Sequence, residues 1–198
     1  MTNVFVNIPD RDERHRELLE QFAASRRFEV TESHAKAMAK RLYSANHAGI
    51  RQRMIERGYF SVTSDNQRVQ VPWPIPGAVA CADGRWELRL CRGLYSPLRD
   101  CSGNILGWEL RRDSSHGNRY QVLSRQVERG NTADSCVIEI PETGEQPLSW
   151  CLPPDWAQEP PKGGCAQMVL TEGKGIKSQV VADRFGLPVL GCGGSLAG

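Results

Sequence analysis

A glutamate beside a glycine-rich turn is the residue best placed for chemistry in this chain. Glu172 follows the short apolar run Met168–Leu170, and Gly173-Lys-Gly175 comes next. Apolar residues then recur at helical spacing as far as Phe185. This order predicts a short buried strand, a tight turn and a helix over about residues 174–185. A carboxylate at such a strand end could manage a proton, and the glycine turn would let a phosphate approach the backbone.

The segment after this helix predicts a second strand. Gly186 is the expected helix end, and Leu187–Leu190 is another apolar run. Two strands joined by a helix form a βαβ unit with a parallel sheet, and the carboxyl ends of its strands are where chemistry is found in open α/β sheets. Lys174 and Lys177 would add positive charge at the helix start. Alternatively, Glu172 caps the helix or forms an ion pair with a lysine.

A second group of candidate residues surrounds a predicted β-hairpin at residues 94–111. Two strand-like runs flank Asp100-Cys-Ser-Gly-Asn104, which is rich in turn-forming residues. Arg111 closes this hairpin, and Arg119 follows before the next short strand at Tyr120–Leu123. Both arginines could contact a phosphate backbone. They could equally be strand-end arginines paired with Asp113 or Glu109.

Two motifs carry a resemblance to a known family. Thr171-Glu-Gly-Lys-Gly-Ile-Lys-Ser178, followed by Arg184-Phe-Gly-Leu-Pro-Val-Leu-Gly-Cys-Gly-Gly194, resembles the opening of a Toprim-like domain. The variant is that of large plasmid- and phage-borne replication proteins of the primase–helicase kind. In that family the matching glutamate is a general acid/base beside a magnesium site, and a later Asp-x-Asp supplies most metal ligands. Glu172 matches the glutamate, whereas the Asp-x-Asp has no counterpart up to Gly198.

The hairpin region resembles the segment that precedes the Toprim domain in bacterial replicative primases. Pro97-x-x-Asp100-x-x-Gly103 leads to Arg111, and Arg119-Tyr120 follows. The resemblance implies that Glu172 is catalytic and a partial Mg²⁺ ligand. It also implies DNA, single-stranded or as primer–template, as partner, with a fused or separate helicase. The residues expected to bind nucleic-acid phosphates are Arg111, Arg119, Gly173, Lys174, Gly175 and Lys177.

Composition limits the possible classes of protein. The chain has 198 residues, a net charge of +2 and a sequence pI near 8.2, which is too mild to predict nucleic-acid binding from charge alone. Apolar runs are too short for a transmembrane span, and the N-terminus does not resemble a signal peptide. We therefore expect a cytoplasmic protein without a membrane partner.

The seven cysteines favour free thiols over zinc or disulfides. Their number is odd, and no secretion signal is recognisable. Cys81, Cys91 and Cys101 recur every ten residues, which invites a zinc interpretation. Structural zinc sites usually use pairs two to four residues apart, and this sequence has no such pair.

The expected fold class is α+β, in four regions. Residues 1–62 should be helical, with helices near 10–27, 31–46 and 50–57 and a break at Gly49. Residues 63–140 should be β-rich, with a strand near 136–140, residues 141–164 a proline-rich connector, and 165–198 the first βαβ unit of a Toprim-like domain. Basic residues of the helical region form either a nucleic-acid-binding face or an ordinary solvated surface, because acidic residues lie among them. His34 and His47 are expected at the surface or at its boundary with the core, and not as metal ligands.

Three hypotheses about function remain after this reading. The first is a replication-associated protein of primase–helicase ancestry, acting on DNA with magnesium through Glu172. The second is a non-catalytic nucleic-acid-binding or scaffolding module of a mobile-element protein. The third, a small nucleotide-binding enzyme unrelated to replication, rests only on the glycines of the βαβ unit. Two parallel strands cannot bury a face alone, so we expect a fragment of a longer protein.

Overall fold

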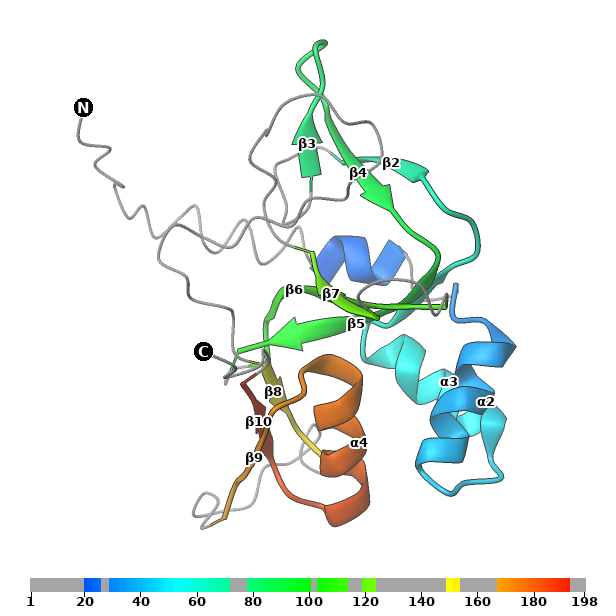
Figure 1. The fold of residues 1–198 in the computed structure, drawn as a ribbon, viewed down its shortest axis with the longest axis vertical. Coiled ribbons are helices and arrows are strands. Elements are labelled where there is room, and N and C mark those ends of the chain that lie inside the picture. The colour runs from blue at the N-terminus through cyan, green and yellow to red at the C-terminus, as the bar shows by residue number, and fades with distance from the viewer. Residues whose placement is uncertain are drawn as a thin grey trace, which may run out of the picture.

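The computed structural model describes seven stretches of the chain, residues 20–25, 29–71, 78–100, 103–113, 119–123, 149–153 and 167–192. Together they form a mixed α+β arrangement, as the sequence predicts (Figure 1). Within these stretches, no helix combines the length and the apolar character that a membrane crossing requires. The predicted strand at 136–140 and most of the predicted helix at 10–27 lie outside the described residues.

The elements follow one another in an order that changes from helices to strands and ends in a βαβ unit. The helical segments are residues 20–25, α2 (Glu32–Arg41), α3 (His47–Glu56) and α4 (Gly175–Phe185). The strands are β1 (Phe60–Val62), β2 (Gln67–Val71), β3 (Ala78–Ala80), β4 (Trp86–Leu90), β5 (Gly93–Arg99), β6 (Ile105–Arg112), β7 (Tyr120–Val122), β8 (Ser149–Cys151), β9 (Val169–Thr171) and β10 (Val189–Gly191).

Side-chain caps determine where the two central helices begin. The Thr31 side chain accepts the backbone N–H of His34 and starts α2, as predicted. The prediction that this helix runs to Asn46 and breaks at Gly49 is wrong. Asn46 instead starts α3, because its Oδ1 accepts the N–H of Gly49 at 2.9 Å, and Gly49 lies inside α3.

A four-stranded antiparallel sheet in the order β1-β5-β6-β7 forms the centre of the molecule. Its hairpin β5–β6 confirms the prediction for residues 94–111. The turn is stabilised by Asp100, whose two carboxylate oxygens accept the backbone and side-chain N–H groups of Asn104 at 2.9 Å. Gly103 has φ +86°, a conformation that glycine adopts without steric cost.

The two faces of this sheet pack against different parts of the chain. On one face, Phe60 stacks on Tyr95 with ring centroids 4.6 Å apart, and Trp108 packs edge-on against Phe22 and Phe60. On the other face, Leu94 packs with Ile176 of α4 and with apolar residues of α2 and α3. Complete burial of one such side chain contributes roughly 1.5–3 kcal/mol. The sheet therefore separates an aromatic core, to which the helical segment 20–25 contributes Phe22, from α2, α3 and α4 (Figure 1).

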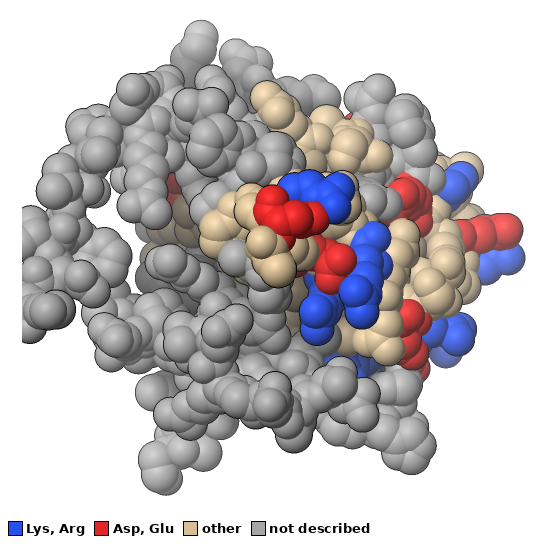
Figure 2. Space-filling model, turned by 90° about the horizontal axis from the view of Figure 1, so that it is seen from above, with Lys and Arg blue, Asp and Glu red and all other residues tan. Residues whose placement is uncertain are grey.

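The second sheet, β2-β4-β3, carries charges that neutralise one another. Glu87 pairs with Arg68 at 3.7 Å and with Arg89 at 3.2 Å, and Asp83 pairs with Arg85. Figure 2 shows acidic and basic side chains side by side among the described residues of the face it presents. Such exposed pairs contribute little to stability.

The C-terminal unit contains the predicted parallel pair and one unpredicted strand. β9 and β10 are parallel, as the βαβ prediction requires. β8 pairs antiparallel with β10, although it lies inside the region predicted to be a connector. β9 is an edge strand, and Leu170 on it is 64% exposed, so the prediction that this strand is buried is wrong.

An ion pair joins this unit to the helical region. The Nη1 of Arg57, the C-cap of α3, lies 2.8 Å from Oδ2 of Asp183 on α4, and both side chains are largely buried. The Nε2 of Gln179 donates to the other Asp183 oxygen at 2.8 Å and to the carbonyl of Leu152 at 2.9 Å. α4 is thus held to α3 and to the residue after β8 by one polar network.

Candidate functional site

The carboxyl ends of β9 and β10 meet the first turn of α4. Glu172 directly follows β9, as predicted, and is exposed. The turn after it is closed by Thr171, whose hydroxyl donates to the carbonyl of Gly173 at 2.9 Å and lies 2.7 Å from the hydroxyl of Ser178. The chain therefore turns from the strand end directly toward the four-stranded sheet.

Gly175 allows the first turn of α4 to lie directly against that sheet. Its φ is +48°, a region that favours glycine. A Cβ at this position would come within 2.6 Å of Oε2 of Glu109 and would also collide with the hydroxyl of Ser96. Any larger residue would push α4 away from β5 and β6, so this glycine fixes the distance between the helix start and Glu109.

Glu109 is a carboxylic acid buried inside this junction, with 6% of its surface exposed. It lies opposite Ser96 in the β5–β6 register. Burial raises its pKa to about 7, although the charges of Lys174 and Lys177 and the backbone N–H of Ile176 favour the ionised form. Within the described residues, Oε2 of Glu109 has no hydrogen-bond partner. Glu109 can therefore take up or release a proton near neutral pH.

Lys174, the residue that precedes α4, is also buried, with 2% of its surface exposed. Burial lowers the pKa of its ammonium group, whereas attraction to Glu109 partly restores it. Glu109, whose pKa is raised, and Lys174, whose pKa is lowered, therefore lie together at the N-terminus of α4, where the helix dipole adds positive potential.

Three further cations surround Tyr120 at the same junction. Arg111 lies opposite Tyr120 in the β6–β7 register, and the Nζ of Lys177 lies 4.8 Å from the Tyr120 ring centroid. Burial would raise the pKa of Tyr120, but a hydrogen bond from Arg41 and the charges of Arg41, Arg111 and Lys177 outweigh it and lower the pKa. We call Arg41, Arg111, Lys174 and Lys177 the basic cluster. It brings together the end of α2, strand β6 and the start of α4.

Three of the residues predicted to bind phosphate thus come together, and the others lie around them. Arg111, Lys174 and Lys177 belong to the basic cluster, and Gly173 and Gly175 form the turn at its edge. Arg119 is exposed at the start of β7, and its carbonyl accepts the N–H of Arg112 at 2.9 Å. Of the alternative partners considered for the arginines, Asp113 pairs with His34 and Arg92 instead.

The magnesium prediction finds no complete ligand set in the described part of the chain. No three His, Cys, Asp or Glu side chains gather there in a way that could hold a metal ion. Glu172 alone offers one exposed carboxylate, whereas Mg²⁺ is usually held by one or two carboxylates together with water and substrate phosphates. A magnesium site at Glu172 therefore stays a prediction.

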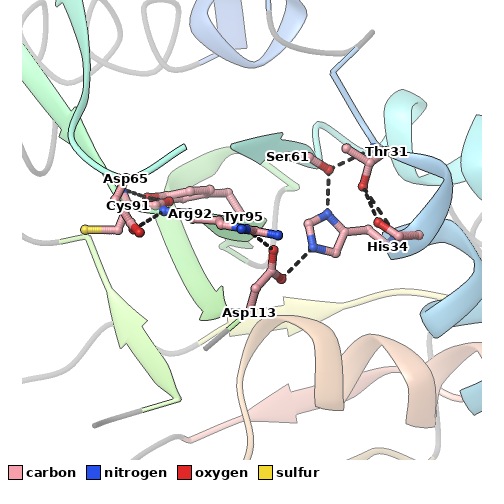
Figure 3. Close-up of polar contacts among 9 residues, drawn as sticks. Thr31, His34, Ser61, Asp65, Cys91, Arg92, Tyr95 and Asp113 are labelled. Atoms are coloured by element: carbon pink, nitrogen blue, oxygen red, sulfur yellow. Dashed lines mark hydrogen bonds and ion pairs between the residues drawn. The ribbon is translucent and has the colours of Figure 1, made fainter. Parts of the chain in front are cut away.

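A second polar group contains serine, histidine and aspartate in hydrogen-bonding order (Figure 3). Nδ1 of His34 lies 2.7 Å from Oγ of Ser61, and its Nε2 lies 2.8 Å from Oδ1 of Asp113. Ser61 also accepts the N–H of Thr31 at 2.9 Å, and Arg92 contacts the other Asp113 oxygen at 3.3 Å. We call these five residues the histidine network.

The histidine network is a structural connection and not a nucleophilic site. Ser61 is 4% exposed, so its hydroxyl is closed to a substrate. A neutral imidazole with its proton on Nε2 donates to Asp113 and accepts from Ser61, which satisfies both ring nitrogens. The prediction that His34 lies at the surface is wrong, because it is 6% exposed and links α2 to β1 and the end of β6.

Glu109, Arg41 and Ser96 were not among the predicted site residues. One feature of the sequence could have indicated Glu109 as a site residue. It lies in a mostly apolar strand, two residues before Arg111, so both side chains must point to the same face of the sheet. Arg41 carries no such signal, because its contact with Tyr120 joins distant segments.

Comparisons with protein-family models, with curated proteins and with solved structures find no match to this chain. The Toprim-like resemblance therefore rests on its two sequence motifs.

Proposed function

We propose that this chain binds DNA phosphates at the junction between the four-stranded sheet and α4, as part of a replication-associated protein. The observation that carries the proposal is the convergence of Arg41, Arg111, Lys174 and Lys177 on Glu109 and Tyr120. Lys177 is exposed and Arg41 and Arg111 are half-buried, so these three side chains can reach a phosphate, whereas the buried Lys174 adds positive potential behind them. The charge of Glu109 acts on Lys174 and Lys177, and Arg41, Arg111 and Lys177 form no ion pair with an acidic side chain of the described residues.

A phosphate would complete the interactions that this junction leaves open. Nε of Arg111 is buried without a hydrogen-bond partner among the described residues, and the helix dipole adds positive potential at the start of α4. Helix N-termini and arginines are the groups that most often hold phosphates. The protonated form of Glu109 would remove the negative charge of this buried carboxylate from the junction, and its pKa near 7 makes that form accessible.

A second candidate function is magnesium-dependent nucleotidyl transfer, which rests on the position of Glu172. This carboxylate lies exposed at the carboxyl end of β9, two residues before Lys174. In such a reaction Mg²⁺ would neutralise phosphate charge. Glu172 would contribute one ligand or accept a proton, and Lys174 and Lys177 would orient the phosphates. The Toprim-like resemblance supports this candidate through the same glutamate.

Binding of a fluorescently labelled single-stranded DNA across a salt series tests the proposal. We expect the affinity of the wild type to fall steeply with salt, because each neutralised phosphate releases counterions. Lys177→Ala should weaken binding and reduce the log–log salt slope by about 0.7, the contribution of one phosphate contact on a single strand. Repeating the series with Mg²⁺ for the wild type and Glu172→Gln separates the two candidates.

The matched control is Arg68→Ala on the second sheet, where Arg68 is exposed and paired with Glu87. It should leave both affinity and slope unchanged. Equal effects of Lys177→Ala and Arg68→Ala, or no binding at low salt, would overturn the proposal. A Mg²⁺ response that Glu172→Gln abolishes supports nucleotidyl transfer, and a response that persists in the variant argues for a binding module.

A further inference from the structure

Tyr43 occupies a position at the end of α2 that normally belongs to glycine. Its φ is +52°, and it is 82% exposed. The N–H of Ser44 donates to the carbonyl of Ala39 at 3.0 Å, and the N–H of Tyr43 to that of Lys40 at 3.3 Å. This is the Schellman pattern, in which the residue in the left-handed conformation is usually glycine. A large aromatic residue here strains the backbone and gains little burial, so the fold alone does not explain it.

The Tyr43 ring lies against an arginine that also contacts a second exposed ring. The guanidinium carbon of Arg184 is 4.7 Å from the Tyr43 ring centroid and 5.9 Å from that of Phe185, which is 65% exposed. Two exposed rings and a guanidinium therefore lie together at the C-terminal end of α4. We call these three residues the stacking platform.

The stacking platform continues the basic cluster along one face of α4. Arg184 follows Lys177 by seven residues, which is close to two helical turns, so both side chains lie on the same face about 10 Å apart along the axis. This distance equals about three steps of a stacked strand at about 3.4 Å per nucleotide. At each end a cation from α4 lies over a tyrosine ring, Tyr120 at one end and Tyr43 at the other.

The charges along this face are complementary to a polyanion. Among the described residues, Lys40, Arg41, Lys177 and Arg184 form no ion pair. Surfaces that bind single strands combine such cations with aromatic rings on which bases stack. A duplex keeps its bases stacked inside the double helix, so the exposed rings of Tyr43 and Phe185 would have no base to stack on.

We propose that Tyr43, Arg184 and Phe185 stack the bases of a single strand whose phosphates lie on the basic cluster. The proposal relies on the proposed function only for the identity of the ligand. The strand follows α4 from its N-terminus to its C-terminus, and two or three bases reach the rings.

Variants of Tyr43 test this proposal by two measurements on the full chain. The probes are a labelled 12-nucleotide oligothymidylate and the same backbone without bases. Stacking of one base on an aromatic ring gives roughly tenfold in affinity. We therefore expect Tyr43→Gly to bind the oligothymidylate about tenfold more weakly, to bind the abasic strand like the wild type, and to leave the salt slope unchanged. Tyr43→Phe should bind like the wild type.

Thermal unfolding distinguishes stacking from a structural contact between α2 and α4. Glycine relieves the strain at φ +52°, so Tyr43→Gly should raise the melting temperature by about 2–4 °C while weakening binding. The control is Leu106→Ala, which shortens an exposed apolar side chain on β6 and should change neither the melting temperature nor the DNA affinity. A lower melting temperature with unchanged affinity in Tyr43→Gly would overturn the proposal. If Tyr43→Gly gives that result but Lys177→Ala still weakens DNA binding, the proposed phosphate-binding function stands without the stacking. If the wild type does not bind single-stranded DNA at all, both the proposed function and the stacking proposal fail.

Discussion

The histidine network and the junction around Glu109 are two partly buried polar groups that differ in whether their polar atoms have hydrogen-bond partners. In the histidine network every polar atom of His34, Ser61 and Asp113 has a partner within the described residues. At the junction, Oε2 of Glu109 and Nε of Arg111 have none. A buried polar atom without a partner costs roughly 1–3 kcal/mol, so it persists only where something compensates.

Whether the polar atoms have hydrogen-bond partners is a better guide to the role of each group than the types of residue in it. Serine, histidine and aspartate in hydrogen-bonding order suggest catalysis, but their mutual satisfaction and burial indicate a connection between elements. The junction contains no familiar catalytic set in the described residues, but its open hydrogen bonds and the opposing pKa shifts of Glu109 and Lys174 are consistent with the phosphate-binding role that we propose for it.

The largest expected effect comes from breaking the histidine network. His34→Ala removes two hydrogen bonds and leaves the hydroxyl of Ser61 and the carboxylate of Asp113 without their central partner. We expect the free energy of unfolding to fall by about 4 kcal/mol, as measured by urea denaturation. DNA affinity at temperatures where the variant stays folded should not change. If His34→Ala lowered the DNA affinity without lowering the free energy of unfolding, the histidine network would have a binding role and not the structural role assigned to it here.

The next effect concerns the pH dependence of stability. The pKa of Glu109 is raised from 4.5 to about 7, so the folded state binds a proton that the unfolded state releases between these values. The stability that this proton confers is fully present below about pH 4.5 and lost as pH rises through 7, a change of about 3 kcal/mol. Glu109→Gln should remove this decline, as seen by urea denaturation at several pH values. An identical decline in wild type and variant would contradict the assignment.

The smallest effect is a shift in a tyrosine titration. The pKa of Tyr120 is lowered by Arg41, Arg111 and Lys177 despite partial burial, whereas burial raises that of Tyr59. Ultraviolet difference titration should therefore show one tyrosine that ionises below the usual value of about 10, and Tyr120→Phe should remove it. Saturating single-stranded DNA should move this titration upward, because phosphates offset the charges of the basic cluster. No change on DNA binding would place the DNA elsewhere.

Local signals in the sequence predicted the elements around the site correctly. The turn-forming residues between Asp100 and Asn104 predicted the β5–β6 hairpin, and the glycines that flank α4 predicted the βαβ unit. Glu172, Lys174 and Lys177 lie on that unit, so their placement followed from local pattern. The identity of α4 and its neighbours as a Toprim-like domain stays a prediction.

Pairings between distant segments could not be predicted in the same way. β8 has three residues and lies in a proline-rich region, so only its partner β10 defines it as a strand. Glu109 becomes a buried acid only because α4 packs onto β6, and His34 becomes a network residue only because Asp113, 79 positions away, reaches it. Composition and periodicity carry no information about such contacts.

The buried ion pair between Arg57 and Asp183 limits how this chain can be divided. It joins residues 126 positions apart, across all three boundaries, 62/63, 140/141 and 164/165, that the sequence suggests for separate regions. Expressing the helical region without α4 would deprive the Arg57 guanidinium of its counterion, and breaking a buried ion pair costs several kcal/mol. Deletion studies that cut at any of these boundaries would measure this cost together with any loss of function. The ion pair therefore makes the stability of α3 depend on the presence of α4.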